Sequence, residues 1–250
     1  MIIRSDVFSS FSRLRFGMST RGGGVSPEPY GMNLSFNVGD DEKNVIANRE
    51  KFFGDVGIGV NALAITRQVH GDTVTCVRAP GSYASCDALI SDEPGVFLAI
   101  TVADCLPVFL FDPVTLSVAA VHIGWRGSKL RILGKAMSAM EEEFGAKAGD
   151  LISFMGPSAR VCCYEVGGEV AVGFPENVLR RSTPAGAHLD LMQFNRNILL
   201  EAGVRETNIE VLHYCTICNG DLFHSYRREG KESGRMMGVI GLVRDENPKS

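Results

Sequence analysis

Residues Val102–Gly127, with the sequence VADCLPVFLFDPVTLSVAAVHIGWRG, decide the fold of this chain. Two apolar runs within them, Leu106–Phe111 and Leu116–Val121, are separated by a turn built on Asp112-Pro113. Short runs rich in β-branched and aromatic residues around a proline turn are typical of two buried strands in one sheet. The stretch therefore predicts a β-hairpin around which the rest of the chain is arranged.

Two reactive side chains lie at the open end of this predicted hairpin. Cys105 directly precedes the first run, and His122 directly follows the second. If the strands pair antiparallel, the start of one and the end of the other lie side by side. A thiol and an imidazole then meet at one edge of a rigid sheet, which is a sound place for a reactive or metal-binding pair. We therefore expect the functional site here.

Composition and charge indicate an ordinary globular protein. Of the 250 residues, 45% are hydrophobic and 22% are charged, as in typical soluble domains. The net charge of −4 offers no basic surface for nucleic acid, and no apolar run reaches the roughly 20 residues that span a bilayer. Neither nucleic acid nor a membrane is therefore an expected partner. The first residues lack the apolar core of a signal peptide and the seven cysteines form an odd set, so we expect a cytoplasmic protein with reduced thiols or metal ligands.

Hydrophobic periodicity in the remaining chain predicts helices and strands in alternation. Helices are expected over residues 41–53, from a cap at Ser128 to residue 144, over 168–174, and between the cap Asp190 and Gly203. Strands are expected over 63–69 and 73–77, joined by the tight turn His70-Gly71-Asp72, and over 87–91, 96–102, 151–155, 209–214 and 235–243. Residues 17–41 predict a long irregular loop, and residues 173–188 a loop that points outward. Because neither a repeat nor a linker is visible, we predict a single α/β domain over residues 1–250.

A C-x-x-C motif at Cys215–Cys218 is the first candidate for a metal site. A closed zinc site needs four ligands, and the sequence has no second C-x-x-C and no H-x-x-x-H. A thioredoxin-like motif would lie near the start of a βαβ unit, whereas this one follows a late strand. The spacing of the motif alone therefore predicts two thiols without a metal.

Several classes of site fail on the residues they require. None of the histidines shows the H-x-E that zinc deaminases combine with P-C-x-x-C. One blue-copper centre takes two histidines and a cysteine, and the three remaining histidines are too few for a further cluster of coppers. The G-x-S-x-G elbow of serine hydrolases is absent as well.

The remaining constellation is His70, Cys105 and His122, each at the end of an apolar strand. Two imidazoles and one thiolate suit zinc, with the fourth position open to water or substrate. The same residues also suit a nucleophile pair, in which His122 lowers the pKa of Cys105. Spacing alone leaves both readings open.

Six motifs occur in order between about residue 17 and residue 243: N-L-S-F-N-V-G-D-D, R-Q-V-H-G, C-D-A-L-I-S, V-A-D-C-L-P-V, V-A-A-V-H-I-G-W-R-G and S-Y-R-R-E-G…G-R. In this order they closely resemble the YfiH-type family, long labelled multicopper polyphenol oxidoreductase or laccase-domain proteins. The resemblance implies an α/β fold of mixed sheets flanked by helices, α/β/β/α-like, with some likeness to cysteine hydrolases. It also implies a purine nucleoside phosphorylase that takes adenosine, inosine, guanosine and methylthioadenosine with phosphate, and that deaminates adenosine.

The resemblance further implies a metal site. The zinc ligands of the family fall on His70, Cys105 and His122, with copper as the alternative metal. Asp87 and Asp104 are candidates to orient a ligand imidazole or to move a proton. A turn-capping role stays open for both carboxylates.

For phosphate, the resemblance points to Arg49, because an arginine in the helix after V-G-D-D is implicated in the family. Its place between apolar positions of that helix hints that it points inward or along a cleft, although periodicity alone would favour a surface arginine. Arg126 and Arg227 are candidate helpers, since a planar guanidinium binds phosphate through two parallel hydrogen bonds. Asn33, which begins the first motif, is a further candidate for substrate binding. A monomer and a homodimer both remain open.

Two rival functions use other features of the same sequence. A metal-independent cysteine hydrolase or amidase would use Cys105 as nucleophile and His122 as base. A redox-responsive binding protein would instead use the Cys162-Cys163 or the Cys215–Cys218 pair. Removing zinc should abolish phosphorolysis but spare or activate a cysteine hydrolase.

Overall fold

The computed structural model describes residues 2–183 and 186–244, which form six α-helices and fifteen strands. The helices are α1 (Glu42–Val56), α2 (Trp125–Lys129), α3 (Ile132–Phe144), α4 (Gly168–Ala171), α5 (Leu191–Ala202) and α6 (Tyr226–Glu229). The strands are β1 (Ile2–Ile3), β2 (Leu14–Ser19), β3 (Leu63–Arg67), β4 (Val74–Cys76), β5 (Gly81–Ala84), β6 (Ala88–Ser91), β7 (Phe97–Val102), β8 (Leu106–Asp112), β9 (Ser117–Ile123), β10 (Ile152–Met155), β11 (Glu165–Gly167), β12 (Leu179–Thr183), β13 (Gly186–Leu189), β14 (Ile209–Val211) and β15 (Met236–Leu242).

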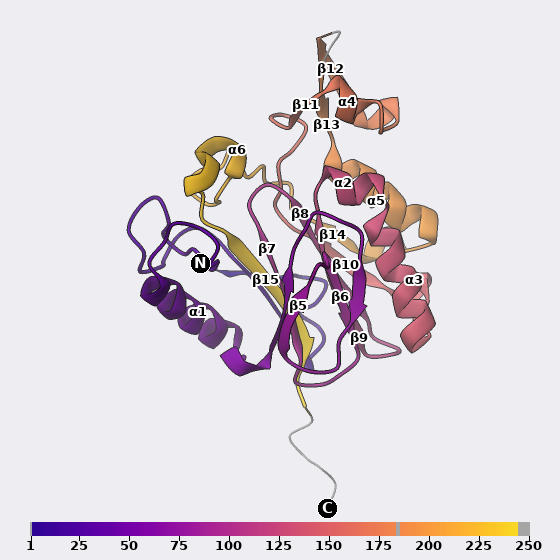
Figure 1. Cartoon of the computed structure of the whole chain (residues 1–250). Helices are drawn as coiled ribbons and strands as arrows, with labels where there is room; N and C mark the ends of the chain where they lie inside the picture. The colour runs from indigo at the N-terminus through magenta and orange to yellow at the C-terminus, as the bar shows by residue number, and fades with distance from the viewer. Residues whose placement is uncertain (1, 184–185, 245–250) are drawn as a thin grey trace, which may run out of the picture.

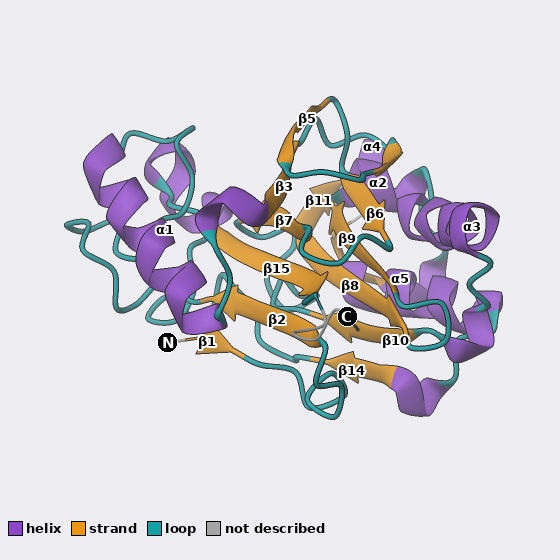
Figure 2. Ribbon diagram, turned by 90° about the horizontal axis from the view of Figure 1, so that it is seen from below, coloured by secondary structure: helices purple, strands orange, loops and turns teal. Residues whose placement is uncertain are grey.

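These elements form four layers (Figures 1 and 2). Two six-stranded sheets pack face to face, one in the order β1-β2-β15-β7-β3-β5 and the other in the order β14-β10-β8-β9-β6-β4. Helix α1 covers the outer face of the first sheet, and α3 and α5 cover the outer face of the second. The expected α/β fold of mixed sheets flanked by helices is confirmed.

The predicted hairpin is the pair β8 and β9 in the second sheet. The strands are antiparallel, with Leu106 opposite Ile123 and Pro107 opposite His122. Every residue of both strands is buried, because one face meets the helices and the other meets the first sheet. Burial on both faces explains why the runs are continuously apolar rather than alternating. His122 lies inside β9, one residue before its end, rather than beyond it.

Helices α1 and α5 begin where their aspartate caps predict, and α5 ends at the predicted Gly203, whereas α1 continues to Val56, beyond the expected end at residue 53. The Asp41 side chain accepts a hydrogen bond from the amide of Lys43, and Gly57 ends α1 with a left-handed φ of 82°. The Asp190 side chain accepts from the amide of Gln193 at the start of α5. Side-chain acceptors satisfy the first free amides of a helix, and glycine adopts the left-handed conformation at its end without strain.

The strands before and after His70 do not form the expected hairpin. β3 lies in the first sheet, parallel to β7 and β5, whereas β4 lies in the second sheet, parallel to β6. The predicted tight turn at residues 70–72 is therefore a crossing between the two sheets. Alternating apolar residues mark a strand, but they do not say which sheet it joins.

The helix expected after Ser128 is two helices with a break between them. α2 begins at Trp125, and Arg131 adopts a left-handed φ of 57° before α3 starts. Ser128 lies inside α2 and accepts a hydrogen bond from the Asn195 side chain, so it is not the predicted cap. Tertiary packing against α5 has overridden the local capping signal.

Residues 173–188 were expected to loop outward, and they do so as folded structure. β12 and β13 pair antiparallel, and β13 also pairs with β11, which forms a three-stranded sheet. This sheet and α4, which is shorter than the expected 168–174, project from the layers (top of Figure 1). Residues 184–185 lie outside the described part. Among the described helices, none has both the length and the apolarity to cross a membrane.

Candidate active site

Three ligand-type side chains from distant segments meet at the open end of the hairpin. His70 lies in the crossing between the sheets, Cys105 directly before β8, and His122 in β9. Their ligand atoms, nitrogen or sulfur, all lie within 4.8 Å of one another. The two imidazole rings are nearly perpendicular, with centroids 4.9 Å apart. Three ligands in this arrangement suit one metal ion with an open fourth position.

Asp87, which is fully buried, organises two of these residues at once. Its Oδ1 lies 2.7 Å from Nδ1 of His122. It also accepts hydrogen bonds from the amides of Val69, His70 and Gly71 at 3.1, 3.0 and 2.8 Å. One carboxylate thus fixes the His122 ring and the turn that carries His70. It leaves Nε2 of His122 as the ring nitrogen available to a ligand.

Cys105 and His122 shift each other's protonation. Burial raises the pKa of the Cys105 thiol, but the imidazoles of His122 and His70 outweigh it and lower that pKa to about 6. Burial lowers the pKa of His122, but the Cys105 thiolate and Asp87 outweigh it and raise that pKa to about 9. Cys105 is therefore held as a thiolate near neutral pH, the form that a metal ligand and a nucleophile both need.

Backbone conformation keeps the space around the ligands open. His70 has a φ of 58° and Asp104 a φ of 87°, in the left-handed region that non-glycine residues adopt at a cost. A Cβ on Gly124 would lie 3.3 Å from the Cys105 sulfur and 3.3 Å from Cδ2 of His70. Any side chain at position 124 would therefore crowd the ligand atoms.

Asp104 is fastened by residues from three distant segments. Its carboxylate accepts hydrogen bonds from Oγ1 of Thr216 at 2.6 Å and from the amide of Arg227 at 2.7 Å. Its carbonyl accepts from the amide of Ala159 at 2.8 Å. These donors engage both carboxylate oxygens, so Asp104 holds the backbone that presents Cys105.

The three ligand residues line a pocket of about 820 Å³. This volume is in the range of small-molecule binding sites. Its wall combines aromatic and cationic side chains with a few neutral polar ones, namely Trp125, Tyr164, Tyr226, Arg67, Arg126, Arg227, Arg235, Ser35, Asn37 and Gln68. Aromatic rings beside guanidinium groups suit a molecule that has both a flat ring and an anionic part.

Three of the pocket arginines each lie over an aromatic ring: Arg126 over Trp125 at 4.5 Å, Arg227 over Tyr164 at 5.4 Å, and Arg235 over Tyr226 at 5.6 Å. Such contacts restrict the orientation of a guanidinium. Nη1 of Arg227 also donates to the Glu165 carbonyl and Nη1 of Arg235 to the Ser233 and Gly234 carbonyls, which leaves Nε and Nη2 of these two arginines for a ligand. Arg126 and Arg227, which the sequence analysis singled out, thus face the same pocket as the three ligand residues.

Arg49 lies behind the pocket wall instead of in it. Its Nε donates to the carbonyl of Leu34 at 2.9 Å, and its guanidinium lies 4.3 Å from the centre of the Phe36 ring. Burial lowers its pKa to about 10. Among the described residues that line the pocket, Arg49 does not appear. The structure gives Arg49 a supporting contact with residues 34–36, and its expected direct contact with phosphate stays a prediction.

Asn33 has a similar supporting position. It is fully buried, and its Oδ1 accepts from the amides of Ser35 at 3.1 Å and Arg235 at 3.0 Å. Its Nδ2 donates to the Ser35 carbonyl and to Asp40. With its amide fully engaged, Asn33 holds two pocket residues in place and does not reach the pocket itself.

Sequence reasoning did not assign Arg235, Tyr164 or Trp125 to the site. Two signals could have found them. Arg235 is a charge directly before a fully apolar strand, and Trp125 is the single tryptophan of the chain, three residues after His122. Tyr164 offers no such signal, because the loop that carries it reaches the pocket only through the tertiary fold.

Residues 15–243 match the family described as multi-copper polyphenol oxidoreductase laccase. A purine nucleoside phosphorylase of Deinococcus radiodurans is 39% identical over 235 residues, which cover 91% of this chain and 89% of that protein. Adenosine deaminase RL5, from an unknown prokaryotic organism, is 32% identical over 225 residues, covering 82% of this chain and 84% of that protein.

Solved structures agree with the sequence comparison. The crystal structure of YlmD from Geobacillus stearothermophilus gives a TM-score of 0.89 at 31% identity and covers 94% of both chains. By sequence and by fold, the chain therefore belongs to the YfiH- and YlmD-type family described as multi-copper polyphenol oxidoreductase laccase.

Proposed function

We propose that the chain is a zinc-dependent purine nucleoside phosphorylase that also deaminates adenosine. The observation that carries the proposal is the convergence of His70, Cys105 and His122 in a pocket lined with aromatic rings and arginines. The names of the relatives, purine nucleoside phosphorylase and adenosine deaminase, support the substrate class. Adenosine, inosine, guanosine and methylthioadenosine are the proposed nucleosides.

The residues present fit a zinc ion. Two imidazole nitrogens and one thiolate are among the donors that zinc takes in open, catalytic sites. Asp87 adds the carboxylate that such sites place behind a ligand histidine. When bound there, zinc supplies Lewis-acid polarisation of an oxygen on the substrate or phosphate. Copper is the alternative metal for the same three ligands.

A laccase-type reaction fits the site less well. Among residues 2–183 and 186–244, the groups of potential metal ligands include His70 and His122 but no further histidine. A multicopper centre needs several more imidazoles than these two. We therefore do not propose a laccase-type oxidation for this chain, although the family description names one.

Phosphorolysis needs an anionic phosphate held beside the ribose while the base departs. We assign phosphate to the guanidinium groups of Arg126, Arg227 and Arg235, which line the pocket and can form paired hydrogen bonds with its oxygens. We assign the flat purine to the aromatic side of the pocket, against Trp125 and Tyr164. Holding both reactants in one geometry supplies much of the rate.

The decisive experiment is a panel of nucleosides incubated with and without phosphate. Phosphate-dependent release of hypoxanthine from inosine supports the proposal, and Cys105→Ala should abolish it. Zinc content is measured on the same samples, purified without added metal. If Cys105→Ala leaves both metal content and turnover unchanged, the assignment fails.

The metal-independent cysteine hydrolase remains distinguishable by experiment. The lowered pKa of Cys105 beside His122 would serve such an enzyme, but the relatives named above are called purine nucleoside phosphorylase and adenosine deaminase. Chelation separates the two functions, because it removes phosphorolysis and leaves a cysteine nucleophile intact or more active.

A further inference from the structure

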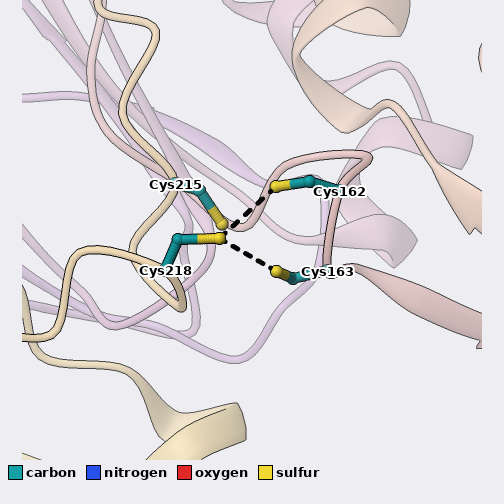
Figure 3. A group of neighbouring side chains, drawn as sticks. All are labelled: Cys162, Cys163, Cys215 and Cys218. Carbon is teal, nitrogen blue, oxygen red and sulfur yellow. Dashed lines mark hydrogen bonds between the residues drawn. The ribbon is translucent and has the colours of Figure 1, made fainter.

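Four cysteines from two loops gather outside the candidate active site (Figure 3). Cys162 and Cys163 lie in the turn before β11, and Cys215 and Cys218 lie in the loop after β14. All four sulfur atoms lie within 4.8 Å of one another. The sequence predicted two thiols without a metal at Cys215–Cys218 because it holds no second C-x-x-C and no H-x-x-x-H. The fold supplies the two ligands that the C-x-x-C motif lacked.

We propose that these four cysteines hold one divalent ion of the zinc class in a closed, structural site. A Zn–S bond of about 2.3 Å in a tetrahedral site places neighbouring sulfurs about 3.8 Å apart. The sulfur of Cys218 lies 3.7 Å from that of Cys162 and 3.1 Å from that of Cys163. These separations fit the ligand shell of a single ion after a small outward shift of the closer pair.

A disulfide explains this arrangement less well than an ion does. A disulfide joins two sulfurs only, at about 2.05 Å, and excludes a third. Here Cys218 is a near neighbour of both Cys162 and Cys163, and Cys215 belongs to the same group (Figure 3). Four thiols that converge on one point without forming disulfide pairs match the ligand shell of one central metal ion.

The backbone around the cluster is already arranged for thiolate ligands. The amides of Cys218, Arg160 and Ile217 donate hydrogen bonds to the sulfur of Cys215. Amide donors around a ligand sulfur are the outer contacts that orient and tune a metal site. The two loops are also joined directly, because the amide of Thr216 donates to the carbonyl of Ser158 at 3.1 Å.

The position of the cluster indicates what the ion does. Cys163 directly precedes Tyr164, which lines the pocket. Thr216, between Cys215 and Cys218, donates to the Asp104 carboxylate beside Cys105. An ion that joins the two loops therefore fixes one wall of the pocket and the base of the projecting three-stranded sheet. It has no open position, so its role is structural.

The test measures the zinc content of a variant whose active site has lost two of its metal ligands. The variant His70→Ala/His122→Ala removes two active-site ligands and should keep about one equivalent of zinc per chain when purified without chelator. Adding Cys215→Ser and Cys218→Ser should remove that equivalent. Adding Cys76→Ser instead, a half-buried cysteine outside both metal groups, should not. The proposal would be overturned if the His70→Ala/His122→Ala variant contained no zinc, or if adding Cys215→Ser and Cys218→Ser left its zinc content unchanged.

A second measurement covers the case in which the serine variant does not fold. Cobalt(II) added to the His70→Ala/His122→Ala protein after its zinc has been removed should give a thiolate-to-metal charge-transfer band with the visible absorption of a tetrahedral ion. Cys218→His keeps a metal ligand at an exposed position and should retain the ion with a weaker charge-transfer band. Absence of the band in the parent, or disulfide-linked cysteines by mass spectrometry under non-reducing conditions, contradicts the site. The result is independent of the proposed phosphorylase activity, because the parent variant lacks two of the three active-site ligands.

Discussion

The candidate active site and the four-cysteine cluster both gather thiols, but they are built in opposite ways. The active site takes three ligands from separate segments at the end of a buried hairpin, and it faces a pocket of about 820 Å³. The cluster takes four ligands from two surface loops, with two of its thiols exposed. Three ligands and a pocket leave room for a substrate, whereas four ligands complete the shell of an ion. The number of ligands and the presence of a pocket therefore distinguish the site proposed to carry out a reaction from the site proposed to stabilise the fold.

The proposed difference between the two sites would be contradicted most clearly if the Cys105 thiol could be removed without loss of activity. Cys105→Ala should lower kcat/KM for phosphorolysis by more than about 100-fold, because outer partners of metal ligands already cost 10–100-fold when removed. Steady-state kinetics on inosine and metal analysis test this together. Cys76→Ala, a half-buried cysteine away from the pocket, is the matched control and should retain the parental rate.

A smaller loss is expected at the carboxylate behind the ligands. Asp87→Asn keeps the shape of the side chain but removes the charge that fixes His122. We expect zinc affinity or activity to fall by about 10–100-fold, measured by competition with a chelator. Asp72→Asn serves as control, since Asp72 pairs with exposed Lys135 and is absent from the described pocket lining. Equal losses in the two variants would remove Asp87 from the site.

A still smaller effect, confined to the KM for phosphate, should distinguish Arg126 from Arg49. Arg126→Ala should raise the KM for phosphate by about tenfold, the lower end for a hydrogen bond to a charged group, while zinc content stays the same. Arg49→Lys keeps the charge behind the pocket wall and should leave that KM nearly unchanged. The reverse outcome would restore Arg49 as the phosphate ligand.

The smallest effect is a pH dependence of stability in protein freed of metal. The pKa of Cys105 is lowered, so its contribution is lost as pH falls through about 6. The pKa of His122 is raised, so its contribution is lost as pH rises through about 9. The Cys105 contribution grows with pH between these values while the His122 contribution shrinks, so the two offset each other and the Tm of chelated protein should change little between pH 6 and 9. Thermal unfolding across pH checks this, and a Tm change of more than about 4 °C within that window would contradict the paired shifts.

Much of the fold was predictable because its signals are local. Continuous apolar runs around Asp112-Pro113 predicted the hairpin, and Asp41 and Asp190 predicted two helix starts. The crossing between sheets at His70 and the break at Arg131 were not predictable, since tertiary packing decides both. A single domain, a cytoplasmic location and the choice between monomer and homodimer stay predictions.

The candidate site divides in the same way. Short motifs marked His70, Cys105 and His122, because strand ends on one sheet edge bring such residues together. They could not show that Arg49 points behind the wall, since a helix position alone does not fix the contacts of a long side chain. Nor could spacing join Cys162-Cys163 to a motif more than fifty residues away, because only the folded chain brings those loops together.

The most direct measurement follows zinc and phosphate-dependent cleavage of inosine in one sample through chelation and metal return. We expect hypoxanthine release to disappear as the active-site zinc is removed and to recover when zinc is restored, with two equivalents per chain needed where chelation has also emptied the four-cysteine cluster. A chelated protein that cleaves inosine at the original rate would contradict the central claim that His70, Cys105 and His122 hold a catalytic ion.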